Sequence, residues 1–563
     1  MTVLFMLVGL AIPVAVVVII VSSIRRRSDA ANAGGGTSSV RRFFQYLLLF
    51  SLTVVAAIGI TDLIGRALGA GIFGDQALAG PVSFVVVGLP LACLIAWWTR
   101  RSMQRDPQER VADAYTLYVT LTAWTALIVA MVGLQGFLAA VLGGDFDGDA
   151  LATLVVWGSL WLLHWRLSLR VGAERNWPHL LLGSLVGLGT AAVGLGLLLG
   201  SSLEILLLHN PDQLVFGKVG GLADYGAVFA TGALVWVRYW LSAAVTLPRS
   251  TPWLVFVLPI GVGGGLFTAL VSGSLLLWQV LVWLLGDPFA DSAQQHFADS
   301  PRAFSFTLVG LLIWWYHGVV LAETRESRTE VRRVYEYLVS LISLLAAAAG
   351  VLMVIVAVIE SFTPGLDLGV SVINTLLGAV TLLVVGVPVW WFFWSRIQKA
   401  ATADPVPETT SLVRRIYLML LFGLAGVAAA VALLVAVFVF MEDVFAGTTS
   451  SETIRSMRYA LGTLATAAAV SAYHGAVYRQ DKAVTLPDQA TGPRSVLLVG
   501  APAPGLHRSL ERATGARVEL RIRADGAAAP WSEETLLAAF ATHPGEDLLV
   551  VAGEDLDVIV LDH

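Results

Sequence analysis

The sequence has very little cysteine and very little charge. Cys93 is the single cysteine among 563 residues, so the chain can form neither an intrachain disulfide nor a cysteine metal cluster. Charged residues make up 13% of the chain, where a soluble domain carries about 25%. Hydrophobic residues make up 57%, and apolar runs of about 20 residues recur, each long enough to cross ~30 Å of hydrocarbon as a helix. These features exclude an ordinary soluble protein and predict an all-α polytopic membrane protein.

The apolar runs predict about 13 transmembrane helices. The first is not a signal peptide, because its apolar stretch is long, it lacks a basic beginning, and Arg25, Arg26 and Arg27 follow it directly. It forms, with the linker "NAGGGTSS", a predicted N-terminal segment over residues 1–39. The predicted helices are 3–24, 43–64, 80–99, 115–142, 150–166, 178–200, 223–241, 253–285, 304–322, 335–360, 370–394, 416–441 and 459–479.

The positions of lysine and arginine predict the orientation of these helices. Segments on one side of the expected membrane hold 24 Lys and Arg residues, and the loops on the other side hold five. Because basic residues are enriched in cytoplasmic loops, the N-terminus is expected outside and the C-terminus in the cytoplasm.

Residues 40–485 are predicted to form six helical hairpins. Three of them open on similar stretches, "VRRFFQYLLLF", "VRRVYEYLVSL" and "VRRIYLMLLFG", and the returning helices end in aromatic residues. Repetition of this kind indicates one supersecondary unit stacked on copies of itself. The predicted hairpins are 40–109, 110–176, 177–250, 251–329, 330–410 and 411–485.

Histidine recurs in every second returning helix. Aligned on W-x-x-H, the second, fourth and sixth hairpins place Trp161 with His164, Trp314 with His317 and Ser471 with His474. The intervals from one histidine to the next are 153 and 157 residues, which predicts that the six hairpins group as three four-helix units.

The stretches "VRRVYEYL", "VRRIYLML", "VGVPVWWFFWSR" and "WLLHWRLSLR" resemble a family of prokaryotic integral membrane proteins, domain of unknown function 5671. The resemblance spans about residues 40–485. It implies a membrane architecture and a prokaryotic plasma-membrane (inner-membrane) location. It implies no substrate and no catalytic residue, because the biochemical activity of the family is unknown.

The three histidines fit several functional or structural roles. His164, His317 and His474 are candidates for binding haem or a metal if their helices converge, since haem needs two facing axial ligands and zinc at least three ligands. A histidine also titrates near pH 6.5 and so suits proton-linked gating. The structural alternative is an interfacial residue bonded to headgroups, water or a backbone carbonyl, beside a belt of tryptophans. We expect the structural role, with no bound cofactor and no metal.

The carboxyl-terminal residues 486–563 have a different composition and predict a small cytoplasmic α/β domain. The order is strand "RSVLLVG", helix "GLHRSLERATG", strand "ARVELRIRA", helix "SEETLLAAFATH" with Ser532 as N-cap, and a hairpin of "DLLVVAG" and "LDVIVLD" around 553–555. Neither G-x-G-x-x-G nor a Walker lysine pattern is present, so nucleotide binding is not expected.

The sequence therefore predicts a non-enzymatic membrane scaffold or interaction protein. Its expected partners are the lipid bilayer and a protein at the carboxyl-terminal domain, and not nucleic acid. One alternative is a transporter or channel, although the carboxylates Asp62, Glu204, Asp224 and Glu360 lie near expected helix ends rather than at mid-membrane. A second alternative is a haem- or metal-binding membrane redox protein.

Overall fold

The computed structural model describes most of the chain. It describes residues 36–69, 78–106, 109, 112–171, 176–207, 218–321, 330–363, 371–403, 405–483, 492–501, 503, 505–523, 531–552 and 556–561. The predicted helix at 3–24 lies outside these residues. The chain divides into two compact units, residues 1–397 with 427–468, and residues 398–426 with 469–563.

Eleven helical segments in the described part of the chain are long and apolar enough to cross a membrane. They confirm a polytopic helical membrane protein. The predicted helix 459–479 is present as part of α18 (Arg458–Ala483), which is not among the eleven. The eleven segments are Arg41–Leu68, Ala79–Arg105, Asp113–Gly143, Gly148–Ser168, Trp177–Leu207, Gly221–Thr246, Thr251–Leu285, Ser300–Leu321, Glu330–Phe362, Val372–Ala403 and Leu412–Ala446.

Helices that follow one another in the sequence pack as pairs in the first unit. The closest pairs are α5 (Asp113–Gly143) with α6 (Gly148–Ser168), and α7 (Trp177–Leu207) with α8 (Lys218–Trp236). The helix α10 (Gly264–Leu285) packs in the same way on α12 (Ser300–Leu321).

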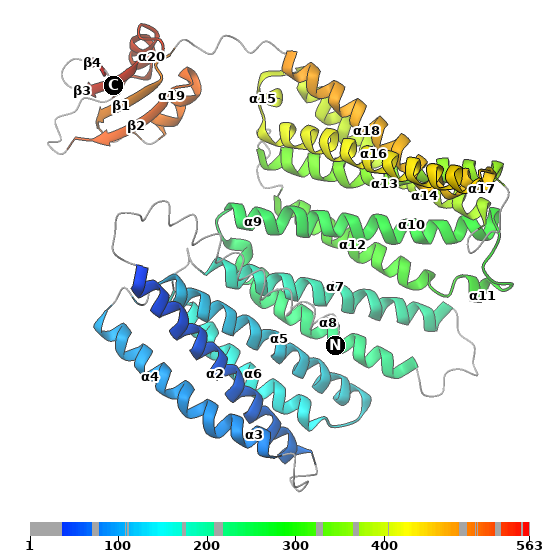
Figure 1. The fold of residues 1–563 in the computed structure, drawn as a ribbon. Helices are drawn as coiled ribbons and strands as arrows, with labels where there is room; N and C mark the ends of the chain where they lie inside the picture. Colours follow the sequence, from blue (N-terminus) through cyan, green and yellow to red (C-terminus); the bar gives the residue numbers. More distant parts are fainter. Residues whose placement is uncertain are drawn as a thin grey trace. The chain divides into compact units, whose positions relative to one another are not determined.

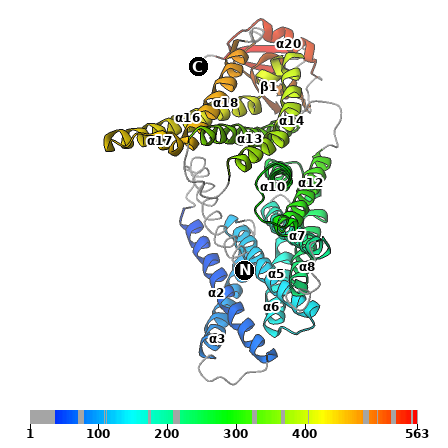
Figure 2. The same ribbon diagram turned by 90° about the vertical axis from the view of Figure 1, so that its right-hand side faces the viewer.

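Neighbouring pairs also contact one another. The helix α5 packs on α8, and α7 packs on α12. Near the beginning of the described chain, α2 (Gly36–Leu68) packs on α4 (Leu89–Arg105), α5 and α6, and these four helices lie side by side (Figure 1). In the turned view, α5 and α6 again lie next to each other (Figure 2). The remaining long helices are α13 (Glu330–Phe362), α14 (Val372–Ala403) and α16 (Leu412–Ala446).

Glycine allows the paired helices to approach closely. A Cβ built on Gly265 would lie 2.9 Å from the Gly310 carbonyl oxygen, and a Cβ on Gly310 would lie 2.7 Å from the Gly265 oxygen. On α7, a Cβ on Gly187 would lie 2.6 Å from the Trp236 backbone nitrogen. Small residues at such crossings let helix backbones touch, which is the usual source of helix association in lipid.

Three stretches of π-helix interrupt these helices, at η1 (Phe84–Gly88), η4 (Val237–Leu241) and η6 (Phe256–Gly263). Pro259 lies inside η6, between α9 (Thr251–Val255) and α10. Because proline cannot donate the i−4 hydrogen bond, the helix widens there by one residue. The sequence predicts a tilt or kink in this region, and the irregular turn lies at the expected residues.

The carboxyl-terminal region forms a four-stranded sheet with two helices (Figure 1). Its elements are β1 (Ser495–Gly500), α19 (Leu506–Thr514), β2 (Arg517–Ile522), α20 (Glu533–Ala541), β3 (Asp547–Ala552) and β4 (Leu556–Leu561). The predicted order of elements is confirmed, as is the cap of α20, where the Ser532 side chain accepts from the Thr535 backbone nitrogen. The residues 553–555 of the predicted hairpin turn lie outside the described residues.

The strands are ordered β2-β1-β3-β4 in the sheet. The central strand β1 pairs in parallel with β2 and β3, and β4 runs antiparallel to β3. Both helices contribute to one core, which contains Leu510 of α19 and Leu536 and Phe540 of α20 against Leu498 and Val550 of the sheet.

We predict that Gly187→Ala destabilises the membrane region, while Gly189→Ala does not. The added methyl group at position 187 would meet the backbone of Trp236, and overpacking of this kind costs about 1–3 kcal/mol. Gly189 is on the same helix, and a Cβ there meets nothing within 4 Å. Thermal unfolding in detergent micelles measures the difference. Equal melting temperatures for the two variants would contradict the close approach of α7 and α8.

Candidate functional site

The three predicted histidines share one local geometry. In each, the ring Nδ1 lies within hydrogen-bond distance of the carbonyl oxygen four residues earlier in the same helix. The distances are 2.9 Å for His164 to Leu160, 2.8 Å for His317 to Ile313 and 2.8 Å for His474 to Val470. Since a carbonyl only accepts, Nδ1 carries the proton in each ring and Nε2 is left as an acceptor. The bond also fixes the ring orientation on its helix.

All three rings are buried, with exposures of 2% for His164, 0% for His317 and 1% for His474. Burial of this degree shields all three rings from lipid headgroups and bulk water. Of the three expected partners, namely a headgroup, water or a backbone carbonyl, the structure shows the backbone carbonyl.

His164 of α6 uses both of its ring nitrogens. Its Nε2 accepts a hydrogen bond from the Tyr118 hydroxyl of α5 at 3.1 Å, and the two rings lie edge to face at 5.5 Å. A metal or haem iron would need that same nitrogen. In this arrangement His164 ties the two helices of its pair together.

His317 of α12 lies in an aromatic pocket. Its ring is 5.8 Å from the Trp240 ring, 6.2 Å from the Phe256 ring and 5.1 Å from the Tyr316 ring. A Cβ on Gly261 would lie 2.4 Å from the imidazole, so glycine is required where the π-helical turn η6 passes over the ring. Its Nε2 is buried and has no hydrogen-bond partner among the described residues.

His474 of α18 repeats the arrangement of His164 in part. Its ring lies 5.9 Å from the ring of Tyr417 on α16 and 5.0 Å from that of Tyr473. As with Tyr118 and His164, a tyrosine of the preceding long helix lies edge to face with the imidazole.

A fourth histidine, His179 at the start of α7, escaped the sequence alignment. Its Nε2 lies 3.4 Å from the Tyr239 hydroxyl, which also accepts from the Trp161 indole at 2.7 Å. The ring is fully buried and lies 5.1 Å from the Trp165 ring. The stretch "NWPHLL" indicates a helix start, but no sequence pattern links His179 to Tyr239, which is 60 residues away.

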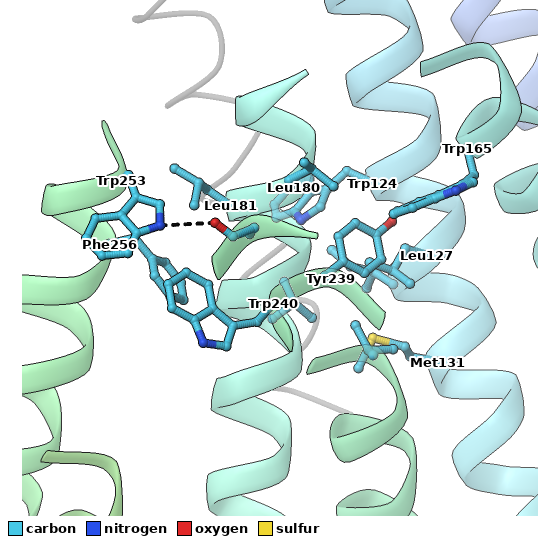
Figure 3. Close-up of a cluster of buried hydrophobic side chains, with 14 of the residues drawn as sticks. Trp124, Leu127, Met131, Trp165, Leu180, Leu181, Tyr239, Trp240, Trp253 and Phe256 are labelled. Carbon is cyan, nitrogen blue, oxygen red and sulfur yellow. Dashed lines mark hydrogen bonds between the residues drawn. The ribbon is translucent and has the colours of Figure 1, made fainter. Parts of the chain in front are cut away.

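Trp165 and Tyr239 belong to a larger cluster of buried hydrophobic side chains, which includes residues of η4 and η6 (Figure 3). Trp240 and Trp253 stack with ring centroids 6.0 Å apart, and Trp240 lies 4.8 Å from Phe256. The Trp240 indole donates to the Tyr316 hydroxyl at 2.9 Å, and the Trp253 indole donates to the Ala244 carbonyl at 3.0 Å.

The expectation of a tryptophan belt is correct in part. Trp97, Trp98, Trp315 and Trp391 are exposed, as a belt in contact with lipid headgroups requires. Trp165, Trp240 and Trp394 are 5% exposed or less and lie within the protein instead. Trp165 is further covered by the Arg238 guanidinium, 3.8 Å from its ring centroid.

Polar side chains tie the ends of the helices together. Near the start of α2, the Gln45 amide donates to the Thr99 hydroxyl at 2.8 Å, and both side chains are buried. Near the start of α13, the buried Glu336 lies 3.4 Å from Arg332 and 3.8 Å from Arg396 of α14. Gln45 and Glu336 hold the same place in "VRRFFQY" and "VRRVYEY".

Charged residues near other helix ends are also paired. Arg414 of α16 makes two contacts to the Asp481 carboxylate of α18, at 2.6 and 2.9 Å. Two carboxylates that were expected near outer ends bind arginine, Glu204 with Arg302 at 3.8 Å and Glu360 with Arg458 at 2.8 Å. These groups neutralise each other across neighbouring helices.

The described residues contain no group of three or more His, Cys, Asp and Glu side chains that could hold a metal ion. The contacts observed around the histidines are buried hydrogen bonds and ring contacts. A role for His164, His317 or His474 in binding a cofactor stays a prediction.

Comparison with known proteins gives one match. Neither the curated proteins nor the solved structures contain a significant match to this chain. A family model, domain of unknown function DUF5671, matches twice, over residues 42–151 and 333–469. The first match covers most of α2 through α5 and the start of α6, and the second runs from α13 into α18. The resemblance noted in the sequence is thereby confirmed for residues 42–151 and 333–469, the two regions that match the DUF5671 model.

Proposed function

We propose that this chain is a multi-pass protein of a prokaryotic plasma membrane, with its N-terminus outside and its carboxyl-terminal α/β domain in the cytoplasm. The uneven distribution of 24 and five basic residues between the two sets of loops supports this orientation. Exposed apolar side chains along the candidate spans, such as Leu162, Leu163 and Leu434, suit contact with lipid.

The membrane region is proposed to contain thirteen helices, one N-terminal helix followed by twelve helices in six hairpins, which are grouped as three four-helix units. The two family matches begin at Arg42 and Arg333, which are the same arginine of two "VRR" entries. They start where the first and third units are expected to start. The shared bond of His164, His317 and His474 to the carbonyl four residues earlier is further support.

Within this architecture, the protein acts as a non-enzymatic scaffold, and its α/β domain is a contact point for a protein partner. The observation that carries the proposal is that both His164 ring nitrogens are engaged within the protein, Nδ1 with Leu160 of the same helix and Nε2 with Tyr118 of α5. In this proposal, the residues that could be mistaken for a ligand-binding site serve to join helices.

One observation favours a second candidate, a haem- or metal-binding redox protein. The buried Nε2 of His317 has no hydrogen-bond partner among the described residues, and an imidazole Nε2 is a common iron or zinc ligand. The absorption spectrum and metal content of the purified protein separate the two candidates. A Soret band or stoichiometric metal that is lost in His317→Phe, but kept in His164→Phe, would favour the second.

We predict an energetic coupling between Tyr118 and His164. Tyr118→Phe leaves the buried His164 Nε2 without its donor, and His164→Phe leaves the buried tyrosine hydroxyl without its acceptor. Each change is expected to cost about 1–3 kcal/mol, and the double variant to cost less than the sum, because removing both partners of a buried bond is nearly neutral. Unfolding of the four proteins of the cycle in detergent measures the coupling.

The cycle has a matched control in Tyr316, whose hydroxyl accepts from Trp240 and has no recorded bond to His164. Tyr316→Phe combined with His164→Phe should be additive. Additivity for the Tyr118 pair as well would remove the support for a packing role of His164.

We predict opposite labelling of two engineered cysteines in intact cells. In a Cys93→Ser background, Asp145→Cys lies in the loop between α5 and α6 and should react with a membrane-impermeant maleimide. Glu534→Cys, on the exposed surface of α20, should react only after the cells are lysed. The reverse pattern would contradict the proposed orientation.

A further inference from the structure

The carboxyl-terminal sheet is covered by helices on one face. The residues that face the core include Val496 and Leu498 of β1 and Leu548 and Val550 of β3, all 2% exposed or less. Side chains alternate along a strand, so Leu497, Val499, Leu549 and Val551 point to the other face. Among the described residues, these four side chains are neither part of the core nor packed against it.

The second face is apolar across three strands. Leu497 and Leu549 lie in register with Ile559 of β4, and Val499 and Val551 lie in the next row. Ile559 and Leu561 are 48% and 42% exposed. All-parallel sheets occur almost only with both faces covered, and the parallel part of this mixed sheet, β1 with β2 and β3, has an apolar second face of the same kind. We call this surface, formed by Leu497, Val499, Leu549, Val551, Ile559 and Leu561, the open face.

The two edges of the open face differ in net charge. The edge strand β2 presents Arg517, Glu519 and Arg521, of which Glu519 and Arg521 form an ion pair. The opposite edge strand β4 presents Asp557. One edge is therefore net positive and the other net negative.

One further acid lies on this face, Asp547 of β3. It is bound by the Arg494 guanidinium and the Ser495 hydroxyl, and it holds the pKa of Arg494 above its usual value. Its charge is thus compensated within the domain, which leaves Asp557 as the acid that sets the sign of the β4 edge.

The register places opposite charges at the two ends of one row. Arg521 pairs with Val499, Val499 with Val551, and Val551 with Asp557, so the row reads Arg, Val, Val, Asp across the sheet. A two-fold axis parallel to the strands, between β1 and β3, would lay this row on its own copy. Arg521 of one chain would then meet Asp557 of the other, and Val499 would meet Val551. A two-fold axis across the strands would instead lay the positive β2 edge on itself.

We propose that the open face binds the open face of a second copy of this chain. This rests on the proposed role of the domain as a contact point, and names the partner as the same protein. The interface is isologous, as in most homodimers, and two such sheets pack face to face about 10 Å apart.

The area of the open face determines how strongly two copies can associate through it. Four strands of six residues, spaced ~4.8 Å apart with ~3.3 Å per residue, cover about 400 Å² per copy. This is below the ~800 Å² per partner of a standard stable interface, so the contact alone is weak. Anchoring of both domains in one membrane raises their effective concentration and compensates for the small area.

Cysteine cross-linking of the full-length chain in membranes tests the proposal. In the Cys93→Ser background, Leu549→Cys lies beside the proposed axis and should give a cross-linked homodimer with a bis-maleimide that spans about 10 Å. Glu534→Cys, on α20 at the other side of the sheet, should not. Equal dimer yields at the two positions would overturn the proposal.

Charge reversal provides a test that does not disturb the core. Arg521→Asp, an exposed change, should lower the Leu549→Cys dimer yield about threefold, as expected for an exposed ion pair replaced by like charges. Combining it with Asp557→Arg should restore the yield. Failure of the double variant to restore it would refute the two-fold arrangement.

The cross-linking also separates this proposal from the role of the domain as a contact point. If Leu549→Cys cross-links to a different protein and not to itself, self-association is refuted while the contact-point role stands. If the open face cross-links to nothing, self-association is refuted, and the labelling of Glu534→Cys and the Tyr118–His164 cycle still test the proposed function independently.

Discussion

Close contact between helix backbones at glycine is the constraint on which the membrane region depends. Lipid tails are as apolar as leucine side chains, so a helix in a membrane gains little by burying leucine against a neighbour. Gly265 and Gly310 each leave the space in which the other's carbonyl oxygen lies, below 3 Å from any added Cβ. Van der Waals contact over such crossings replaces the hydrophobic effect as the force that joins α10 to α12.

Close packing excludes water, and this decides where polar groups can lie. A polar side chain between helices must find a partner in the protein, because hydrocarbon offers none. Gln45 finds Thr99, Arg414 finds Asp481, and Glu360 finds Arg458. Since each of these partners comes from another helix, the three pairs also fix how two helices meet. Stability and polar satisfaction are therefore achieved by the same contacts.

The sequence predicts the elements of this protein well and their contacts poorly. Helix positions follow from apolar runs and from the basic residues that flank them, and the strands of the tail follow from alternation. The π-helical turn η4 could not be predicted, because its residues "VRYWL" include neither proline nor glycine. At η6, Pro259 predicts an irregular helix but fits a kinked and a widened one equally. Tyr239 and His179 are 60 residues apart and share no pattern. The strand order β2-β1-β3-β4 likewise depends on packing that no local signal carries.

The sequence singles out three histidines but does not predict what surrounds them. His164, His317 and His474 share one feature in the structure, the bond of each ring to the carbonyl four residues earlier in its own helix. What each ring meets beyond that bond depends on the helix opposite. Tyr118 and Tyr417 supply a tyrosine to two of them, whereas the π-helical turn at Gly261 brings backbone against His317.

This difference in ring partners bears on the role of the repeated histidines. A ligand set requires the same free nitrogen at each position, whereas a packing residue requires only that the ring fill the space its neighbours leave. At His164 the Nε2 is occupied by Tyr118, and at His317 aromatic rings surround the imidazole. The fixed part of the arrangement is the bond that orients the ring, and the variable part is the partner. That combination is expected when a helix-pair unit is reused and each copy is fitted to a different neighbour.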